Sequence, residues 1–293
     1  MSEYGGQTMV ATLRRVMVCA PRDAGWNEAA RAAEWKMLGY GHAPNSEVAQ
    51  AQHEALRREL EEADVEVIAL PASDELTLDA VFVHDPSLMT DSGAICLQMG
   101  KTERENEPAA HAVRFRAQKI PVLGEMTTPG MAEAGDMVWL DAKTLLVGRG
   151  YRTNAAGIEQ LRELLAPKGV DVISAPLPHG GGPSVCMHLM SLMSMLDEQT
   201  ILVDLEWLAV ETVELLRQQG FRFIEIEQAE RSTLACNVLS LGGGRLLALA
   251  ENAKTNQRLS AAGFDVRTFP GSEVAINGGG GPTCLTRPIL RTV

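Results

Sequence analysis

Cys284 stands in the most unusual segment of the chain, AINGGGGPTCLTRP, where four glycines precede it by a few residues. Glycine is used where a backbone must approach a ligand closely or adopt a positive φ angle. A thiol beside such a loop can be a nucleophile whose thiolate is stabilised by backbone N–H groups or by a bound cation. The alternative is an inert, buried cysteine behind a flexible turn.

A nucleophilic thiol needs a partner that accepts and returns protons near neutral pH, which a histidine can do. His188 lies in the apolar segment CMHLMSLMS, where its ring must find a polar partner, and a satisfied core histidine is the alternative. Glu133, in EAGD, is a carboxylate that could orient this histidine. Its small neighbours Ala134 and Gly135 allow a sharp turn of the chain there.

Four further charged residues could bind a substrate. Asp79 and Asp85 flank the apolar segment AVFVHDP, which we expect to be a strand, and carboxylates placed there could bind a cation, although each alone is more often a turn former. Arg104 and Arg152 each follow a predicted strand and precede a predicted helix. Arginine grips a carboxylate in a planar fork, and two solvated surface side chains are the alternative.

The elements that must position these residues recur about five times: a strand, a turn, a second strand, an amphipathic helix and a third strand. The clearest copy has strands over 136–140, 145–150 and 170–177, and a helix that Asn154 caps. Further copies cover 191–227, where Gly220 suits the end of a helix, and 237–269. Weaker copies have strands over 81–90, 92–99 and 120–124, with a helix before Lys119, and strands over 14–20 and 65–72, with a helix after Asn45.

This alternation predicts the α/β class. A doubly wound sheet is one interpretation, although no GxGxxG follows the first strand. The other is a closed ring of five ββαβ units whose strand ends point towards one central cavity. No shift in composition divides the chain, so we expect residues 1–293 to form a single domain.

Charge and composition exclude several classes of protein. The 293 residues carry 26 Lys plus Arg against 38 Asp plus Glu, a formal charge of −12, which disfavours nucleic-acid binding. No secretory signal and no membrane-spanning apolar run is visible, so we expect a soluble cytoplasmic protein without a membrane partner. Five scattered cysteines without a CxxC pair indicate neither a disulfide framework nor a zinc site, and we place four of them in the core: Cys19, Cys96, Cys186 and Cys236.

Taken together, FVHDP, EAGD, GRGYRTN, MHL and GGGGPTCLT resemble the motif series of the guanidine-modifying enzymes of the pentein fold. These are the arginine deiminases, the amidinotransferases and the dimethylarginine dimethylaminohydrolases, and the chain is most similar to the last group. The motifs follow in order from about Val81 to Leu285. The family fold is a five-bladed α/β-propeller of ββαβ repeats around an active-site cavity, which agrees with the repeats in this chain.

The resemblance implies a cysteine-dependent hydrolase of an arginine-like guanidine. Cys284 matches the nucleophile, His188 the general acid and base, and Glu133 the carboxylate that orients the histidine. Attack on the guanidinium carbon would expel an amine, leave a thiouronium on Cys284 and give citrulline after attack by water. This chemistry implies no metal and no cofactor.

The resemblance also implies how the substrate is held. Asp85 matches the residue that grips the guanidinium nitrogens, Asp79 matches the one that faces the α-amino group, and Arg104 and Arg152 match those that hold the α-carboxylate. The partner is therefore a small guanidine, arginine or a methylated arginine. A homodimer is possible, and the sequence gives no oligomeric state.

Two positions depart from the family patterns. Met190 stands where deiminases and amidinotransferases usually carry an aspartate, which favours a substituted guanidine over plain arginine. His84 stands where dimethylaminohydrolases usually carry a glutamate, beside the alkyl-bearing nitrogens, which weakens the assignment of methylated arginine in particular. Asp85 itself argues against the arginine dihydrolases, which have asparagine there.

Three functions remain open from the sequence. The first is a hydrolase of an Nω-substituted arginine, with methylated arginine as the expected substrate. The second is an arginine deiminase or an amidinotransferase of the same fold. The third is a non-catalytic pentein binding protein, like the initiation factors that bind the ribosome, and Cys284, His188, Glu133 and Asp85 together count against it. The segment over 177–184 is interpreted as a loop, with an active-site lid as the alternative.

Overall fold

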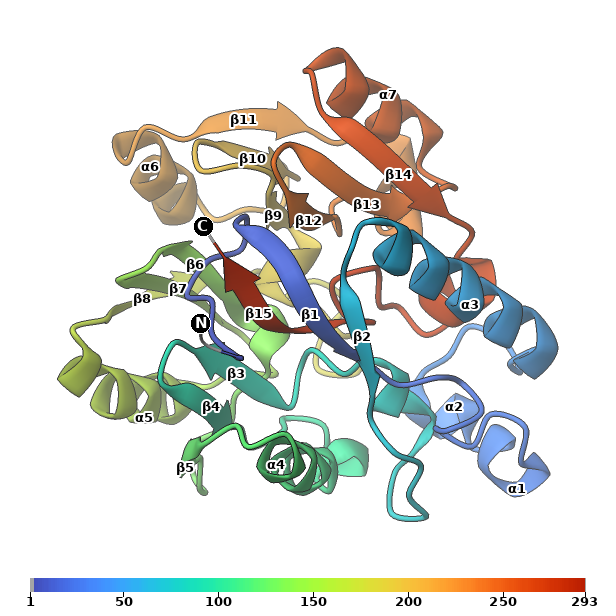
Figure 1. The fold of residues 1–293 in the computed structure, drawn as a ribbon. Coiled ribbons are helices and arrows are strands. Elements are labelled where there is room, and N and C mark those ends of the chain that lie inside the picture. The colour runs from blue at the N-terminus through green and yellow to red at the C-terminus, as the bar shows by residue number, and fades with distance from the viewer. Residues whose placement is uncertain (1–2, 293) are drawn as a thin grey trace.

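The computed structural model describes residues 3–292, which contain five three-stranded sheets arranged as a ring (Figure 1). In every sheet the middle strand pairs with one edge strand antiparallel and with the other parallel. A helix connects the middle strand to the parallel one and lies on the outside of the ring (Figure 1). The predicted ring of five ββαβ units is confirmed, and the doubly wound sheet is not found.

Three consecutive units follow the predicted copies closely. One consists of β6 (Met137–Asp141), β7 (Thr144–Arg149), α5 (Ala155–Leu165) and β8 (Asp171–Pro176). The next consists of β9 (Met193–Met195), β10 (Thr200–Val203), α6 (Val210–Gln218) and β11 (Arg222–Glu225). The third consists of β12 (Leu239–Gly242), β13 (Arg245–Leu249), α7 (Ala253–Ala261) and β14 (Asp265–Phe269).

The two weaker copies are also complete units. One consists of β3 (Ser87–Thr90), β4 (Gly93–Cys96), α4 (Glu107–Ala117) and β5 (Val122–Glu125). The other combines both ends of the chain in β1 (Thr12–Val18), α1 (Ala29–Ala32), α2 (Trp35–Leu38), α3 (Ser46–Glu62), β2 (Glu66–Ala69) and β15 (Arg287–Thr292). The last strand, β15, pairs antiparallel with β1 and closes the ring.

Local sequence signals explain where helices begin and end. The Asn154 side chain accepts a hydrogen bond from the Gly157 backbone N–H at 2.7 Å and so starts α5 as predicted. Gly220 follows α6 with a φ of +86°, the left-handed conformation that a glycine adopts most easily. Both predictions from the sequence are confirmed.

The segment before β3 differs from the prediction. The apolar run expected as a strand between Asp79 and Asp85 is a 3₁₀ helix, Leu78–Val81, followed by turns, and β3 begins only at Ser87. Every residue from 78 to 90 is buried. The segment is therefore apolar because all its sides are covered, and it lacks the alternation of apolar and polar residues that is typical of a strand with one exposed face. The two aspartates are therefore not the ends of a strand: Asp79 lies in the buried 3₁₀ helix, and Asp85 lies on the buried turn that follows it.

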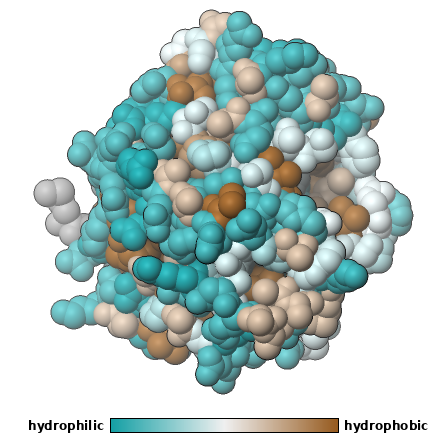
Figure 2. All heavy atoms as spheres, turned by 90° about the vertical axis from the view of Figure 1, so that its right-hand side faces the viewer, coloured by the Kyte–Doolittle hydropathy of each residue, from teal (hydrophilic) through white to brown (hydrophobic). Residues whose placement is uncertain are grey.

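The large apolar side chains of the described residues lie mostly between sheets and helices. Four clusters of buried apolar residues fill the space between these elements. The face in Figure 2 is largely hydrophilic, with only small, separate apolar spots. Among residues 3–292, no helix combines the length and the apolar character needed to cross a membrane.

Candidate active site

One cavity of about 480 Å³ gathers the predicted functional side chains. It is lined by six of the seven predicted site residues: Asp79, Asp85, Arg104, Arg152, His188 and Cys284. The seventh, Glu133, is completely buried and contacts His188 from behind. The ring of units therefore brings together side chains that are far apart in the sequence.

The glycines before Cys284 allow a close approach between backbone and side chains. A Cβ at Gly280 would lie 2.5 Å from the Phe82 ring, and one at Gly281 would lie 2.5 Å from Asn237 Oδ1. Gly279 has a φ of +80°, which other residues rarely adopt. The loop is therefore tightly packed, and its glycines hold Cys284 at the wall of the cavity.

The Cys284 thiol lies in a partly shielded, polar environment. The Asn237 Nδ2 group donates a hydrogen bond to Cys284 Sγ over 3.4 Å, and sequence analysis did not single out this asparagine. Burial, reinforced by Asp85, raises the pKa of Cys284 to about 11, while His188 acts in the opposite direction. The thiol is therefore protonated at neutral pH in the free protein, and a bound cation would lower its pKa.

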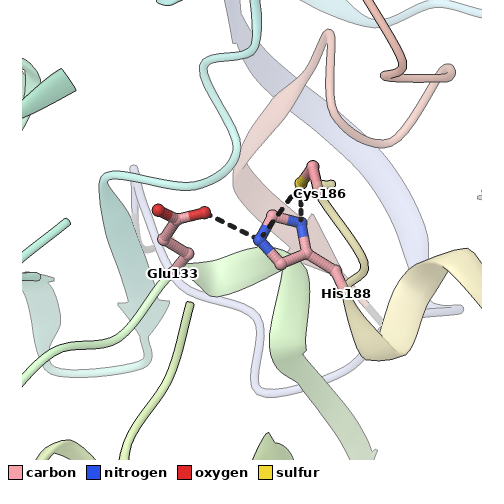
Figure 3. Close-up of side chains that lie close together, drawn as sticks. All are labelled: Glu133, Cys186 and His188. Carbon is pink, nitrogen blue, oxygen red and sulfur yellow. Dashed lines mark hydrogen bonds and ion pairs between the residues drawn. The ribbon is translucent and has the colours of Figure 1, made fainter. Parts of the chain in front are cut away.

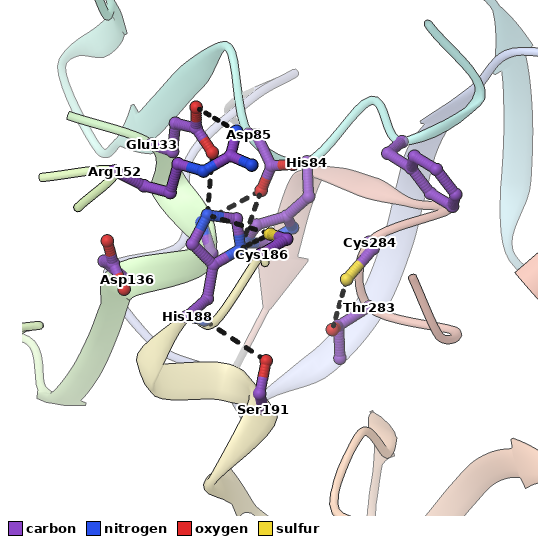
Figure 4. A network of polar contacts seen from close by, with 12 residues as sticks. His84, Asp85, Glu133, Asp136, Arg152, Cys186, His188, Ser191, Thr283 and Cys284 are labelled. Carbon is purple, nitrogen blue, oxygen red and sulfur yellow. Dashed lines mark hydrogen bonds and ion pairs between the residues drawn. The ribbon is translucent and has the colours of Figure 1, made fainter. Parts of the chain in front are cut away.

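His188 is held by contacts on several sides (Figure 4). It precedes the 3₁₀ helix Leu189–Ser191, and its backbone N–H donates to Ser191 Oγ over 3.2 Å. The ring Nε2 lies 2.7 Å from Glu133 Oε2, and Nδ1 lies 3.8 Å from Asp85 Oδ1. Burial lowers the pKa of His188, but Cys186 and the nearby carboxylates raise it well above the usual value, which favours the imidazolium.

Glu133 is fixed as an anion. Its Oε1 accepts hydrogen bonds from the backbone N–H groups of Gly100 and Lys101, each over 3.1 Å. Burial acts to raise the pKa of Glu133, but the hydrogen bond with His188 and nearby positive charges lower it to about 2. A carboxylate held from behind in this way orients the imidazole and stabilises its charged form.

The turn after Glu133 leaves space for the histidine. A Cβ at Gly135 would overlap His188 Nδ1, and the Gly135 N–H donates to Asp85 Oδ1 over 3.1 Å. Asp136, which sequence analysis treated only as the start of a strand, accepts hydrogen bonds from the Leu189 N–H over 2.9 Å and from Thr153 Oγ1 over 2.6 Å. It thereby fixes the segment that carries His188.

Asp85 lies beside a buried arginine. Arg104 Nη1 donates to Asp85 Oδ2 over 2.6 Å, and two other Arg104 nitrogens donate to the Glu107 carboxylate, each over 2.8 Å. Burial acts to raise the pKa of Asp85, while His188 and Arg104 lower it below the ordinary value. Arg104 is only 4% exposed, so the alternative of a solvated side chain is wrong. Most of its donors are used within the protein, and its predicted contact with an α-carboxylate stays a prediction.

Asp79 and Arg152 occupy other parts of the same cavity wall. Asp79 Oδ2 pairs with Lys101 Nζ at 2.5 Å, and Lys101, which sequence analysis did not identify, also lines the cavity. Arg152 Nη1 lies 3.5 Å from Glu133 Oε1, and burial of its side chain excludes the solvated alternative. Arg152 therefore has donors that remain for a ligand.

Cys186 was placed in the core, and this prediction is wrong. The residue is exposed, lines the cavity and precedes His188 by two positions. Its Sγ lies 3.6 Å from His188 Nδ1 and 3.8 Å from Nε2, and Figure 3 shows it above the ring. The error arose because the local run SVCMHL is apolar, although it follows the glycine-rich segment over 177–184, which has no helix or strand. The other three cysteines assigned to the core are buried.

Cys186, His188 and Glu133 also form the one group among residues 3–292 that could supply three metal ligands. Their ligand atoms all lie within 4.8 Å of one another. His188 and Glu133 are hydrogen-bonded to each other in this arrangement, so a metal would have to separate them. The direct contact between His188 and Glu133 suits proton transfer by the histidine.

His84 and Met190, the two departures from the family patterns, do not line this cavity. Both line a smaller cavity behind it. His84 Nδ1 lies 3.0 Å from the Thr286 carbonyl oxygen, and its backbone N–H donates to the Cys284 carbonyl. The expectation that His84 lies beside the alkyl-bearing nitrogens of a substrate is therefore not met.

Several known proteins are similar to this chain in sequence and in fold. The dimethylarginine dimethylaminohydrolase of Pseudomonas aeruginosa is 30% identical over 80% of this chain and 87% of its own. Its structure complexed with citrulline superimposes with a TM-score of 0.77, at 24% identity, over 95% of this chain and 100% of that one. The arginine deiminase of Listeria innocua is 26% identical over 72% of this chain but only 61% of its own length.

A family model supports the same relationship over most of the chain. The family described as N,N dimethylarginine dimethylhydrolase, eukaryotic, matches residues 22–291, which include every predicted site residue. The motifs that carry the resemblance and the five-unit ring agree with this match. The chain belongs to the N,N dimethylarginine dimethylhydrolase family.

Proposed function

We propose that the protein hydrolyses Nω-methylated arginine to citrulline and a methylamine. Membership in the family makes the chain a cysteine-dependent hydrolase that cleaves a C–N bond of a guanidino group. The observation that carries the proposal is the shared cavity of Cys284, His188 and Asp85, with Glu133 behind the histidine. What we propose beyond family membership is the identity of the substrate, a methylated arginine.

The reaction follows from the protonation states. A bound guanidinium lowers the pKa of the Cys284 thiol, which releases its proton to solvent, and the thiolate then attacks the guanidinium carbon while Asp85 holds its nitrogens. The His188 imidazolium gives its proton to the leaving nitrogen, so that the amine departs and a thiouronium remains on sulfur. The neutral imidazole accepts a proton from water, whose oxygen attacks the same carbon. The C–S bond then breaks, and the hydroxyl proton of the adduct returns to the departing sulfur, so that the neutral urea product and the Cys284 thiol are formed.

The cavity suits an N-methyl substituent. Its volume of about 480 Å³ lies within the usual range for small-molecule sites. The Phe82 ring packs against Gly280 next to Cys284, and Leu38 and Ile276 extend the apolar wall. Because His84 and Met190 lie outside this cavity, neither charge nor bulk from these positions opposes a methylated nitrogen.

The α-carboxylate of the substrate is assigned to Arg152. Among the described residues, the other cations of the cavity wall have strong partners: Arg104 binds two carboxylates, Lys101 binds Asp79, and Arg231 binds Asp204 and Glu206. Arg152 has one carboxylate contact, at 3.5 Å. Arg152→Ala should therefore raise the KM for an amino acid substrate, whereas no change would indicate a guanidine without a carboxylate, such as agmatine.

The direct test is product formation from two substrates in parallel. Purified protein is incubated with asymmetric dimethylarginine and with arginine, and citrulline and dimethylamine are measured, with Cys284→Ala as the blank. Turnover of the methylated substrate with release of dimethylamine is expected. Turnover of arginine alone would replace the proposal by an arginine deiminase, and a fully active Cys284→Ala variant would exclude the assigned nucleophile.

A small-molecule guanidine is the partner that this proposal requires. A cytoplasmic location and a homodimer stay predictions from the sequence. Cell fractionation and light scattering of the purified protein would check them.

A further inference from the structure

A second cavity lies inside the ring. Its volume is about 30 Å³, the space of a single small ligand. Its wall includes residues from one edge strand of each of the five sheets, β3, β6, β9, β12 and β15. Most of the side chains are apolar, and six are methionines: Met9, Met89, Met137, Met190, Met193 and Met195.

Two arginine side chains also line this largely apolar cavity. Arg287 and Arg291, four residues apart on the same face of β15, both line the cavity and are 5% and 6% exposed. Within residues 3–292, no carboxylate forms an ion pair with either guanidinium; Asp85 contributes only a longer-range attraction to Arg287. The ring interior thus holds two buried positive charges without a counter-ion from the described chain.

The hydrogen bonds of these arginines are also incomplete. Arg287 Nη1 donates to the backbone carbonyls of His84 and Ser87, and Arg291 Nη1 donates to the Ala11 carbonyl over 2.7 Å. Arg287 Nε and Arg291 Nη2 are buried and have no partner among the described residues. An unpaired charge and an unsatisfied N–H group are each costly inside a protein, so this pair needs a further acceptor.

The nature of the cavity selects the ligand. Thioether sulfurs can bind soft metal ions, but two guanidinium groups repel a cation from the same space. The volume excludes an extended organic anion, and the lining methyl groups suit a weakly hydrated sphere better than a large oxyanion. We propose that the cavity binds one small monovalent anion, chloride, between Arg287 and Arg291.

The proposed site is linked to the candidate active site. Arg287 Nη2 lies 3.3 Å from His84 Nε2, and His84 directly precedes Asp85. Thr283, which directly precedes Cys284, lines the same cavity. The bound anion therefore stabilises the inner side of the segments that carry Asp85 and Cys284, and it stabilises the strand β15 that closes the ring.

Bromide locates the site directly in the unmodified protein. Crystals grown or soaked in bromide should show an anomalous peak between the Arg287 and Arg291 guanidinium groups. A well-ordered cavity with only water, or with no peak, would overturn the proposal. This measurement does not depend on turnover, so it stands or fails separately from the proposed substrate.

Chloride should also stabilise the fold specifically. Gluconate is too large for the cavity, so it serves as the reference anion. When chloride replaces gluconate at constant ionic strength, the unfolding temperature should rise with the chloride concentration and then reach a plateau. At a chloride concentration ten times the Kd, the unfolding equilibrium constant should fall about elevenfold. Arg291→Met should abolish this response, and the matched control Arg116→Met, at an exposed position on α4, should retain it. A peak without this anion-specific stabilisation would indicate an adventitious ion only and would refute the proposal.

Discussion

At the scale of single residues, Glu133 controls the histidine without lining the cavity. Its Oε2 contacts His188 Nε2 at 2.7 Å, and its other oxygen is fixed by two backbone N–H groups. Glu133→Gln keeps the shape but removes the charge that stabilises the imidazolium, so kcat should fall by roughly 10²–10⁴-fold. Steady-state kinetics with the methylated substrate measure the change.

The lower kcat of Glu133→Gln should result from impaired catalysis and not from impaired folding. The pH at which His188 titrates should move to a lower value in Glu133→Gln, because the variant lacks the carboxylate that favours the charged ring. Glu103→Gln, at an exposed position near the same cavity wall, is the matched control and should be as active as the original protein. An unchanged kcat in Glu133→Gln would contradict the role assigned to this carboxylate.

Cys186 offers a second prediction at this scale, since its sulfur lies above the His188 ring and raises the pKa of that residue. Cys186→Ser replaces the polarisable sulfur by a hydroxyl that does not ionise in this pH range. We expect the NMR titration midpoint of His188 to move to lower pH. Ser184→Ala, on the same exposed loop, should leave the midpoint in place. Equal midpoints in both variants would show that Cys186 does not influence the histidine.

At the scale of elements, helix α3 carries a buried histidine without a polar partner. His53 is 1% exposed, and neither ring nitrogen has a hydrogen-bond partner among the described residues. Burial, with help from Arg57 and Arg22, lowers the pKa of His53 to about 4. The unfolded chain, with a histidine pKa near 6.5, therefore binds this proton first, and stability falls as the pH drops from about 6.5 towards 4.

His53→Leu should remove this acid sensitivity. When the pH is lowered from 7.5 to 5, the unfolding free energy of the variant should rise by about 2 kcal/mol relative to that of the original protein. Urea denaturation at the two pH values measures this difference. Val48→Ala, at an exposed position on the same helix and without an ionisable side chain, should show no such change. A constant difference between His53→Leu and the original protein at both pH values would refute the prediction.

Elements that depend on neighbouring residues could be predicted from the sequence, and those that depend on distant contacts could not. The Asn154 cap and the Gly220 terminus are local, so their signals were readable. The partner of β1 lies at the other end of the chain, and nothing in the β15 sequence specifies this pairing. Likewise, the motifs predicted the residues around the cavity, whereas Asn237 and Lys101 reach it only through the fold.

At the scale of the whole molecule, the position of the site follows from ring closure. The residues of the candidate site come from several units, so no unit alone could form it. Arg104 and Arg152 lie between a strand and a helix of two units, and the others lie in segments that join neighbouring units: Asp79, Asp85, Glu133, His188 and Cys284. The unit that contains both ends of the chain holds the ring together, because β15 pairs with β1 while the segment just before β15 carries Cys284. Weakening this pair should therefore affect the stability of every unit.

Ile289→Ala tests this dependence at the closing strand. Ile289 is completely buried on β15, and its carbonyl accepts a hydrogen bond from the Gly5 N–H. Loss of its side chain should cost about 2–5 kcal/mol of unfolding free energy, whereas Val113→Ala, 66% exposed on α4, should cost less than about 0.5 kcal/mol. Because we propose that residues 1–293 form one domain, tryptophan fluorescence and circular dichroism should report a single transition that moves as a whole. Two separated transitions in Ile289→Ala would show that the closing unit unfolds independently and that the ring is not one cooperative structure.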